Sequence, residues 1–281
     1  MPPLRMWLAP ALAGVAIAAA PGMAGAGDVS SSQRLDENPC LTERVRFLNC
    51  PDLIMAPPFG IYAQRVGRRV RLRAGNSIDN VGRGPAELHG RRIGPRFMRA
   101  RQRIYRRAGG RIGVETGARM EFKYAHLGRR WWKFHNAARF ELWRLDGDGR
   151  RVRLERDGPK VSYCLRDYMH TRPRMRRSPP RAVYPACDTY PARQRETIGT
   201  SVGWSDVYPP TYPEQWIDVT GLRGCFAYVH IADPGNGIYE SNERNNSSRV
   251  IVRLPWRGPG RRGCRGGGAA PGPGGSDPYG Y

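Results

Sequence analysis

Acidic side chains are scarce in this 281-residue chain. Its 24 Asp and Glu residues stand against 47 Lys and Arg, almost all of them arginine, and the formal net charge at pH 7 is +23. This balance favours attraction to anionic surfaces such as cell-wall polymers, acidic lipids or nucleic acid. The chain is also rich in Gly, Pro and Ala. Because GC-rich codons favour these residues together with Arg, the charge alone does not identify a partner.

A nucleic-acid-binding signature is missing. The densest basic run, RPRMRRSPPR from Arg172 to Arg181, is not interleaved with aromatic residues, and no nucleic-acid-binding motif accompanies it. We therefore expect anionic polymers of the cell envelope, and no nucleic acid, as partners of the basic surface.

Long apolar runs are missing beyond residue 26. Residues 1–26 carry Arg5, then the apolar stretch MWLAPALAGVAIAAAP, then the small residues Ala24-Gly25-Ala26. This order is typical of a secretory signal peptide. A membrane anchor is the weaker interpretation, because the run is short and has a proline at both ends. We expect a secreted, extracellular protein without a membrane span.

The six cysteines are even in number, which in an oxidising compartment predicts disulfides and not reactive thiols. Many connectivities are open to six cysteines. Cys40 and Cys50 are close enough for a local loop, and the remaining pairs that we expect are Cys164 with Cys187 and Cys225 with Cys264.

Long segments with helical periodicity are also rare. Apolar and polar residues alternate in GRRVRLRAGNSIDN from Gly67, and again on both sides of Asp-Gly-Asp-Gly in ARFELWRLDGDGRRVRLE from Ala138, which predicts a hairpin. Residues 225–234 and 247–256 form a further strand pair. The fold predicted is all-β and sandwich-like, with long loops and few short helices. The expected organisation is a signal peptide (1–26), a polar lead-in (27–50), one domain (51–256) and a disordered Gly/Pro-rich tail (257–281).

The polar loop between the last two strands has two interpretations. Residues 233–246 include Asp233, Glu240, Glu243 and several asparagines, whose oxygens could bind calcium. The spacing is not that of an EF-hand loop, and Asn, Asp and Gly are common turn formers. A structural turn is the favoured interpretation.

Three sequence windows carry a family resemblance. The first, GTSVGWSDVYPPTYPEQWIDVT (199–220), contains Gly203 and Asp206 and places Tyr208 seven residues before the Gln-Trp-Ile-Asp run that begins at Gln215. The second, GPKVSYCLRDY (158–168), holds a Lys-x-Ser-aromatic-Cys-Leu-x-Asp run. The third, VHIADPGNGIYESNERNNSSRV (229–250), contains a Glu-Ser loop between two strands. In their order along the chain they resemble the catalytic domain of the lysyl oxidase family, over roughly Pro51 to Pro255.

The resemblance implies specific chemistry. Members of that family oxidise primary amines, including peptidyl lysine, to aldehydes with copper and a lysyl tyrosylquinone, and the residues that match the cofactor positions here are Lys160 and Tyr208. Tyr190 lies in a similar Cys-Asp-Thr-Tyr segment, but it is too far from Gln215 to keep the register. Asp206 is the candidate base for removing the substrate's α-proton.

Histidine is scarce, with five in the chain, and the His-x-His-x-His copper motif of the family is missing. Aligned on Phe-Glu-Leu-Trp, the ligand positions hold Gly128, Arg130 and Trp132, or one residue later Arg129, Trp131 and Lys133. His126 and His135 flank this gap and are the candidate metal ligands, together with His170 or His230. Arg cannot deprotonate to bind a metal, and Trp offers only a hydrogen-bond donor.

Two hypotheses follow from this departure. One is an amine oxidase with an altered copper site. The other is an inactive, basic β-domain that binds an anionic envelope surface.

Three geometric expectations accompany the hypotheses. Lys160 and Tyr208 should approach each other. Trp216 should be buried, with Ile217 on the opposite face of its strand. Arg130 or Lys133 should place a positive charge near the former copper position.

Overall fold

A computed structural model describes residues 37–124, 128–159, 161–258 and 264–265. The all-β prediction is confirmed: the described residues form fifteen strands and one short 3-10 helix, η1 (Glu43–Phe47). Within these ranges no helix is long and apolar enough to cross a membrane. The expected signal peptide and most of the expected tail lie outside the described residues.

The larger sheet has ten strands. Its main path, in spatial order, is β11 (Arg195–Thr200), β5 (Ala86–Arg92), β6 (Phe97–Arg106), β7 (Arg111–Tyr124), β8 (Arg130–Leu145), β14 (Gly224–Ala232) and β15 (Ser247–Leu254). Three further strands pair with it: β1 (Leu48–Asn49) with β6, and both β9 (Arg151–Asp157) and β10 (Val161–Tyr163) with β8. The expected hairpin around Asp-Gly-Asp-Gly is the β8–β9 pair.

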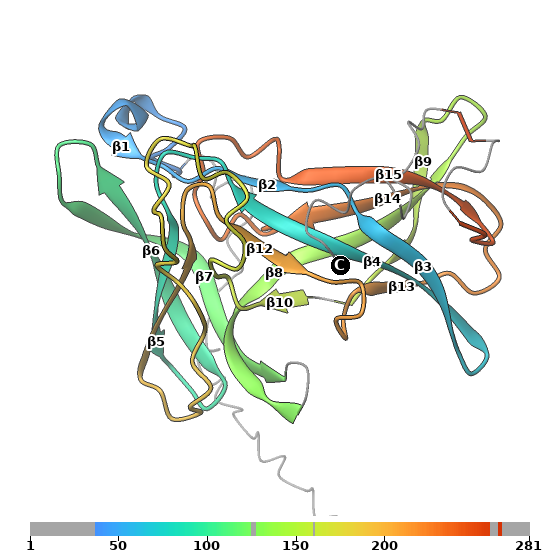
Figure 1. Cartoon of the computed structure of the whole chain (residues 1–281), viewed down its shortest axis with the longest axis horizontal. Helices are drawn as coiled ribbons and strands as arrows, with labels where there is room; N and C mark the ends of the chain where they lie inside the picture. The colour runs from blue at the N-terminus through green and yellow to red at the C-terminus, as the bar shows by residue number, and fades with distance from the viewer. Residues whose placement is uncertain (1–36, 125–127, 160, 259–263, 266–281) are drawn as a thin grey trace, which may run out of the picture.

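The smaller sheet has five strands centred on β4 (Arg69–Asn80). β12 (Ser205–Tyr208) and β13 (Trp216–Asp218) pair with β4, as do β2 (Leu53–Met55) and β3 (Phe59–Val66). Figure 1 shows β4 running across the middle of the molecule over β8 and β14. One hydrophobic core joins the two sheets, so the fold is sandwich-like; it includes Leu72, Ile78, Phe140, Leu142, Phe226 and Tyr228.

All three expected disulfides are present. The Cα–Cα distances are 5.9 Å for Cys40–Cys50, 5.7 Å for Cys164–Cys187 and 5.7 Å for Cys225–Cys264. Such distances are ordinary for a disulfide. The bond between Cys164 and Cys187 ties the strand region after β10 to the end of the arginine-rich loop.

The prediction for Trp216 is wrong. Ile217 is the fully buried residue of β13, while Trp216 is half-buried and lies under the guanidinium of Arg71, 4.1 Å from its ring centroid. β13 pairs with β4 so that Ile217 lies opposite Leu72, which is also in the core. Because side chains alternate along a strand, residues 216 and 218 then face outward.

Candidate functional site

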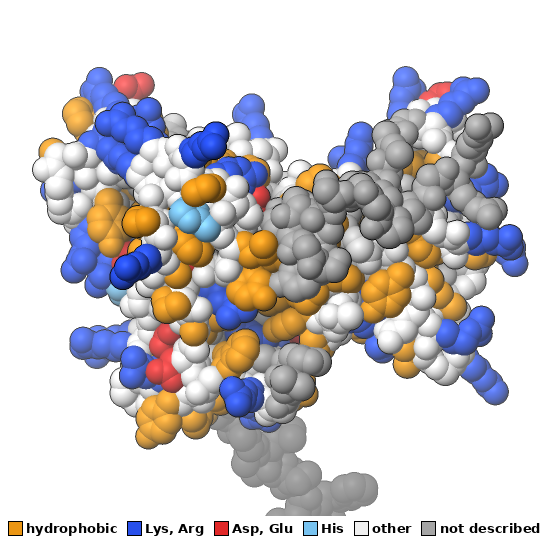
Figure 2. Space-filling view, viewed as in Figure 1, with side chains coloured by type: hydrophobic (Ala, Val, Ile, Leu, Met, Phe, Trp, Pro, Cys, Tyr) orange, Lys and Arg blue, Asp and Glu red, His pale blue; other side chains and the backbone are white. Residues whose placement is uncertain are grey.

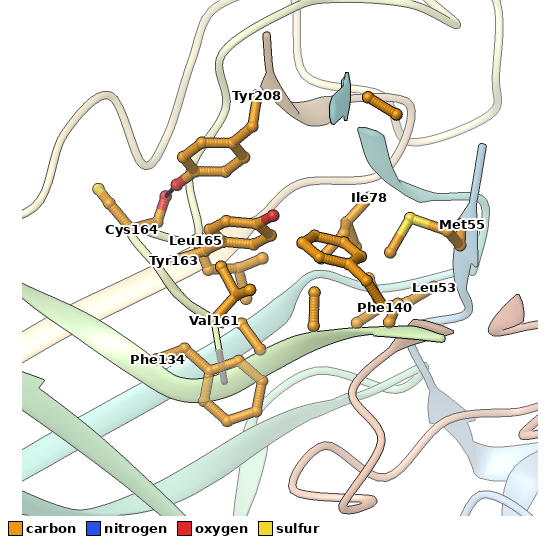
Figure 3. Close-up of a cluster of buried hydrophobic side chains, with 14 of the residues drawn as sticks. Leu53, Met55, Ile78, Phe134, Phe140, Val161, Tyr163, Cys164, Leu165 and Tyr208 are labelled. Carbon is orange, nitrogen blue, oxygen red and sulfur yellow. Dashed lines mark hydrogen bonds between the residues drawn. The ribbon is translucent and has the colours of Figure 1, made fainter. Parts of the chain in front are cut away.

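Three tyrosines from separate parts of the chain meet inside the molecule. Tyr163 in β10 and Tyr208 in β12 stack with ring centroids 3.8 Å apart and planes 13° apart. Tyr212 meets the Tyr208 ring edge-on at 4.8 Å and the Tyr163 ring at 6.2 Å. Figure 3 shows the Tyr163–Tyr208 stack beside Cys164 and Leu165. We call these three residues the tyrosine cluster.

Tyr208 is placed by strand pairing and by a tight turn before its strand. β12 pairs with β4 so that Tyr208 lies opposite Asn76, and its hydroxyl donates to the Cys164 carbonyl at 3.2 Å. Gly203 turns the chain into β12 with φ 77°, a conformation that favours glycine. Burial raises the pKa of Tyr208 well above its ordinary value, so its phenol stays protonated.

Gln215 anchors the cluster from the segment after Tyr208. Its side-chain amide is fully buried and donates to the Tyr163 hydroxyl at 2.5 Å, and Asn76 donates to the same hydroxyl at 2.8 Å. Two amide donors therefore fix the Tyr163 ring against which Tyr208 stacks. The part of the Gln-Trp-Ile-Asp run that supports Tyr208 is thus Gln215, and not Trp216.

Asp206 lies two residues before Tyr208 on strand β12 and is fully buried. Burial raises the pKa of Asp206 well above its ordinary value, and the positive charges of Arg166 and Lys133 offset part of this effect. Neither carboxyl oxygen has a well-formed hydrogen bond with the described residues. A carboxyl group with a raised pKa is chemically suited to accept a proton near neutral pH.

Lys133 reaches the same region from β8. Its side chain is fully buried, and its amine donates to the Tyr212 hydroxyl at 2.7 Å and to the Tyr124 carbonyl at 2.9 Å. Burial lowers the pKa of Lys133 to about 8, although the carboxylates of Glu214 and Glu121 act in the opposite direction. Arg130, the other candidate for this role, is exposed. A basic nitrogen therefore sits beside the tyrosine cluster.

Comparison with known proteins agrees with this arrangement. The family model described as Lysyl oxidase matches residues 95–257. The chain belongs to the lysyl oxidase family. No curated protein matches the chain. The matched range contains Tyr208, Asp206 and the tyrosine cluster, so the lysyl oxidase resemblance covers the site itself.

The copper ligands expected of a lysyl oxidase do not converge among the described residues. His135 pairs with Glu121 at 3.1 Å, and His170 stacks on Trp204 at 4.3 Å and bonds to Ser178. In the described parts of the chain, none of the histidines His135, His170 and His230 forms a ring contact or hydrogen bond with a tyrosine of the cluster. His126 and Lys160 both lie outside the described residues. The expected approach of Lys160 to Tyr208 therefore stays a prediction.

His230 is the most buried of these histidines. It lies between Phe140, at 4.2 Å, and Tyr228, at 4.7 Å, and burial lowers its pKa to about 3. Neither ring nitrogen has a hydrogen-bond partner among the described groups. Its surroundings are aromatic, which suits a neutral imidazole in the core.

The donor groups around the tyrosine cluster do not fit copper. Copper(II) favours several imidazole nitrogens, whereas the side chains here are phenols, one carboxyl group and the Lys133 amine. Within the described ranges, no group of three or more His, Cys, Asp and Glu residues could hold a metal ion. A lysyl oxidase copper site is therefore not assembled from these residues.

The polar loop after β14 is organised by its own hydrogen bonds. Asp233 accepts from the backbone amides of Gly237 at 2.8 Å and Ile238 at 2.7 Å. Glu240 is fully buried and accepts from the backbone amide of Leu53 and from the Asn246 side chain. These contacts fit the turn interpretation of the loop.

Two members of the site were not assigned roles from the sequence. Tyr163 is visible only as the aromatic position of its window, and Tyr212 has no motif of its own. The role of Tyr163 depends on strand pairing, because β10 pairs with β8 while β12, which carries Tyr208, pairs with β4. Tyr212 lies in the turn between β12 and β13, and its ring is placed by the packing of that turn.

Proposed function

We propose that this lysyl oxidase family member has lost copper- and quinone-dependent oxidation of primary amines, and that its basic β-domain binds anionic polymers outside the cytoplasm. The buried Lys133 carries the proposal. It occupies one of the positions at which the family's motif places a copper ligand, and its amine is already bonded to Tyr212 and Tyr124.

The chemistry of Lys133 supports the loss of the metal. With its pKa near 8 the amine is mostly protonated at neutral pH, and an ammonium group has no lone pair for a metal. The nearest alternatives, Arg129 and Trp131, cannot serve as ligands either. A positive charge at Tyr212, which packs against Tyr208, would also repel a metal cation.

The location and partner rest on charge and disulfides. Three disulfides fit an oxidising compartment, in agreement with the expected signal peptide. A net charge of +23 supports binding of envelope polyanions.

A second candidate function is amine oxidation with an altered copper site. The observation that favours it is the retained geometry of Tyr208, with Asp206 buried on the same strand and its pKa raised. In this candidate Lys160 and Tyr208 form the lysyl tyrosylquinone, Asp206 acts as the base, and His126 and His135 bind copper. The substrate is a primary amine or peptidyl lysine.

One experiment separates the two candidates. The secreted chain is expressed with copper, and bound copper, quinone redox staining and hydrogen peroxide release with a primary amine are measured beside a Tyr208→Phe variant. We expect no copper, and no stain or peroxide above the level of the variant. Stoichiometric copper with staining that Tyr208→Phe abolishes would establish the second candidate.

A gain-of-function variant tests the cause of the loss. Replacing Arg129, Trp131 and Lys133 together by histidine restores an alternating triad, with Arg129 directly before β8 and the other two positions on it. We expect this variant to bind about one copper ion per chain, because imidazole is the donor that the site lacks. A folded triple variant without copper would count against Lys133 as the reason for the loss.

A further inference from the structure

Four arginines lie side by side across the outer face of the larger sheet. The strand register places Arg195 of β11 opposite Arg91 of β5, Arg91 opposite Arg99 of β6, and Arg99 opposite Arg119 of β7. All four are exposed. We call them the arginine row. Because neighbouring strands are about 4.8 Å apart, the row spans roughly 15 Å across the strands.

The arginine row is not neutralised by the protein. None of its four side chains has an ion pair or hydrogen bond among the described residues, although neighbours on the same face do: Arg101 pairs with Glu115 at 2.9 Å and Arg103 with Glu87 at 3.4 Å. Like charges directly opposite each other on adjacent strands are destabilising. The row contains three such arginine pairs on successive strands. A bound anion that contacts all four arginines would reduce the repulsion between them.

A hollow lies at one end of the row. The register between β6 and β7 shifts after Arg99, and Gly117 takes φ 76° at this point. The hollow has a volume of about 400 Å³ and is lined by Ile93, Arg99, Glu115, Gly117, Ala118 and Arg119. Two members of the row therefore border a concave surface that a chain of atoms can enter, while Glu115 is held by Arg101.

We propose that the arginine row binds a linear polymer with repeating phosphate groups, which lies across strands β11, β5, β6 and β7. A guanidinium group offers paired donors that match phosphate oxygens, and four of them in line favour a ligand whose charges repeat along one direction. One exposed aromatic ring, Phe97, lies on the same face of β6 two residues before Arg99, but it packs edge-on against His135 with ring centroids 6.2 Å apart. The row itself offers charge and paired donors, whereas single-stranded nucleic acid uses successive aromatic rings for base stacking. The class of partner rests on the proposed function, whereas the position of the site rests on the strand register.

Binding of long-chain inorganic polyphosphate to the full secreted chain tests the site. The row variant carries Arg91→Gln, Arg99→Gln, Arg119→Gln and Arg195→Gln. The matched control carries Arg65→Gln, Arg68→Gln, Arg223→Gln and Arg249→Gln, which are exposed arginines elsewhere and give the same net charge. We expect the row variant to lose at least ~10-fold in affinity at moderate salt and the control to lose less than ~3-fold. The slope of log affinity against log salt should fall by about 3 in the row variant.

A charge-conserving variant guards against misfolding. Replacing the four residues by lysine keeps the charge but removes the paired donors, so we expect an affinity between those of the wild type and the glutamine variant. Thermal unfolding of every variant is measured alongside.

Each outcome separates the site from the general function. Equal losses in the row and control variants would reject the row but leave diffuse polyanion binding intact. Absence of polyphosphate binding by the wild type would overturn the site and, if poly-glutamate and single-stranded homopolymer DNA also fail to bind, the proposed function. Tighter binding of either of those polymers than of polyphosphate would reject phosphate as the recognised group.

Discussion

Lys133 brings an ionisable amine into the interior of the molecule, where water cannot solvate its charge. The folded state lowers the pKa of Lys133 to about 8 from its ordinary value of 10.5. Between these two pH values the unfolded chain binds more protons than the folded chain at this site. The free energy of unfolding should therefore rise with pH across this window, by at most about 3 kcal/mol.

A Lys133→Met variant isolates this effect. Methionine has a similar length and no charge, so the rise between pH 8 and pH 10.5 should disappear while all other groups titrate as before. Denaturant unfolding of both proteins at pH 7, 9 and 10.5 measures the difference. Parallel pH dependences in the two proteins would contradict the prediction, because they would show that folding does not lower the pKa of Lys133.

Gly203 shows, at the scale of an element, how one backbone conformation places a strand. Its φ is 77°, and a Cβ atom would lie 2.5 Å from the Arg172 carbonyl oxygen and 2.6 Å from the Ser178 hydroxyl oxygen. Gly203→Ala should lower the free energy of unfolding by about 1–3 kcal/mol through backbone strain, with a further loss from the clash. It should also displace β12, which carries Asp206 and Tyr208.

Gly221 provides the control for this prediction. Its φ is 73°, but no atom lies within 4 Å of an added Cβ, so Gly221→Ala tests strain without a clash. Thermal or denaturant unfolding should show the larger loss for Gly203→Ala. Equal losses would mean that the close approach of Gly203 to Arg172 and Ser178 adds nothing to the free-energy cost of the alanine substitution.

Strand β13 illustrates how far sequence alternation can be used at this scale. Alternation in Gln-Trp-Ile-Asp separates Trp216 from Ile217 correctly, because successive side chains point to opposite faces. It does not say which face meets the core. That choice is made by the pairing of Ile217 with Leu72 on β4, a residue far away in the sequence. The larger size of Trp216 favours the opposite and wrong prediction, that the face of Trp216 is buried.

The whole molecule carries a charge that opposes its own compactness. With a net charge of +23 and basic side chains projecting around the rim of the face shown in Figure 2, mutual repulsion should lower stability at low salt. The thermal midpoint should therefore rise by several degrees between about 0.01 M and about 0.5 M NaCl, as screening shortens the range of the repulsion.

The arginine row should account for part of that rise. Its glutamine variant should show a smaller increase with salt than the variant with the same number of arginines removed elsewhere, because charges directly opposite on adjacent strands repel most strongly. Scanning calorimetry over a salt series measures both. A salt response that depends only on net charge would contradict a special role for the row.

The sequence by itself determined the all-β class, an even set of six cysteines and the seven-residue spacing between Tyr208 and Gln215. These features depend on local alternation, on cysteine count and on ungapped windows, and all of them are read along the chain without knowledge of long-range contacts. The three disulfide pairs agree with the expectation, but the sequence left other connectivities open, and the structure settled them. Tertiary structure decided which face of β13 is buried, that Lys133 and not Arg130 is buried beside the tyrosine cluster, and that four arginines from four strands form one row. Side-chain alternation has the same period in every strand, so it cannot specify which residues become neighbours across strands; that depends on long-range pairing and on the burial it brings.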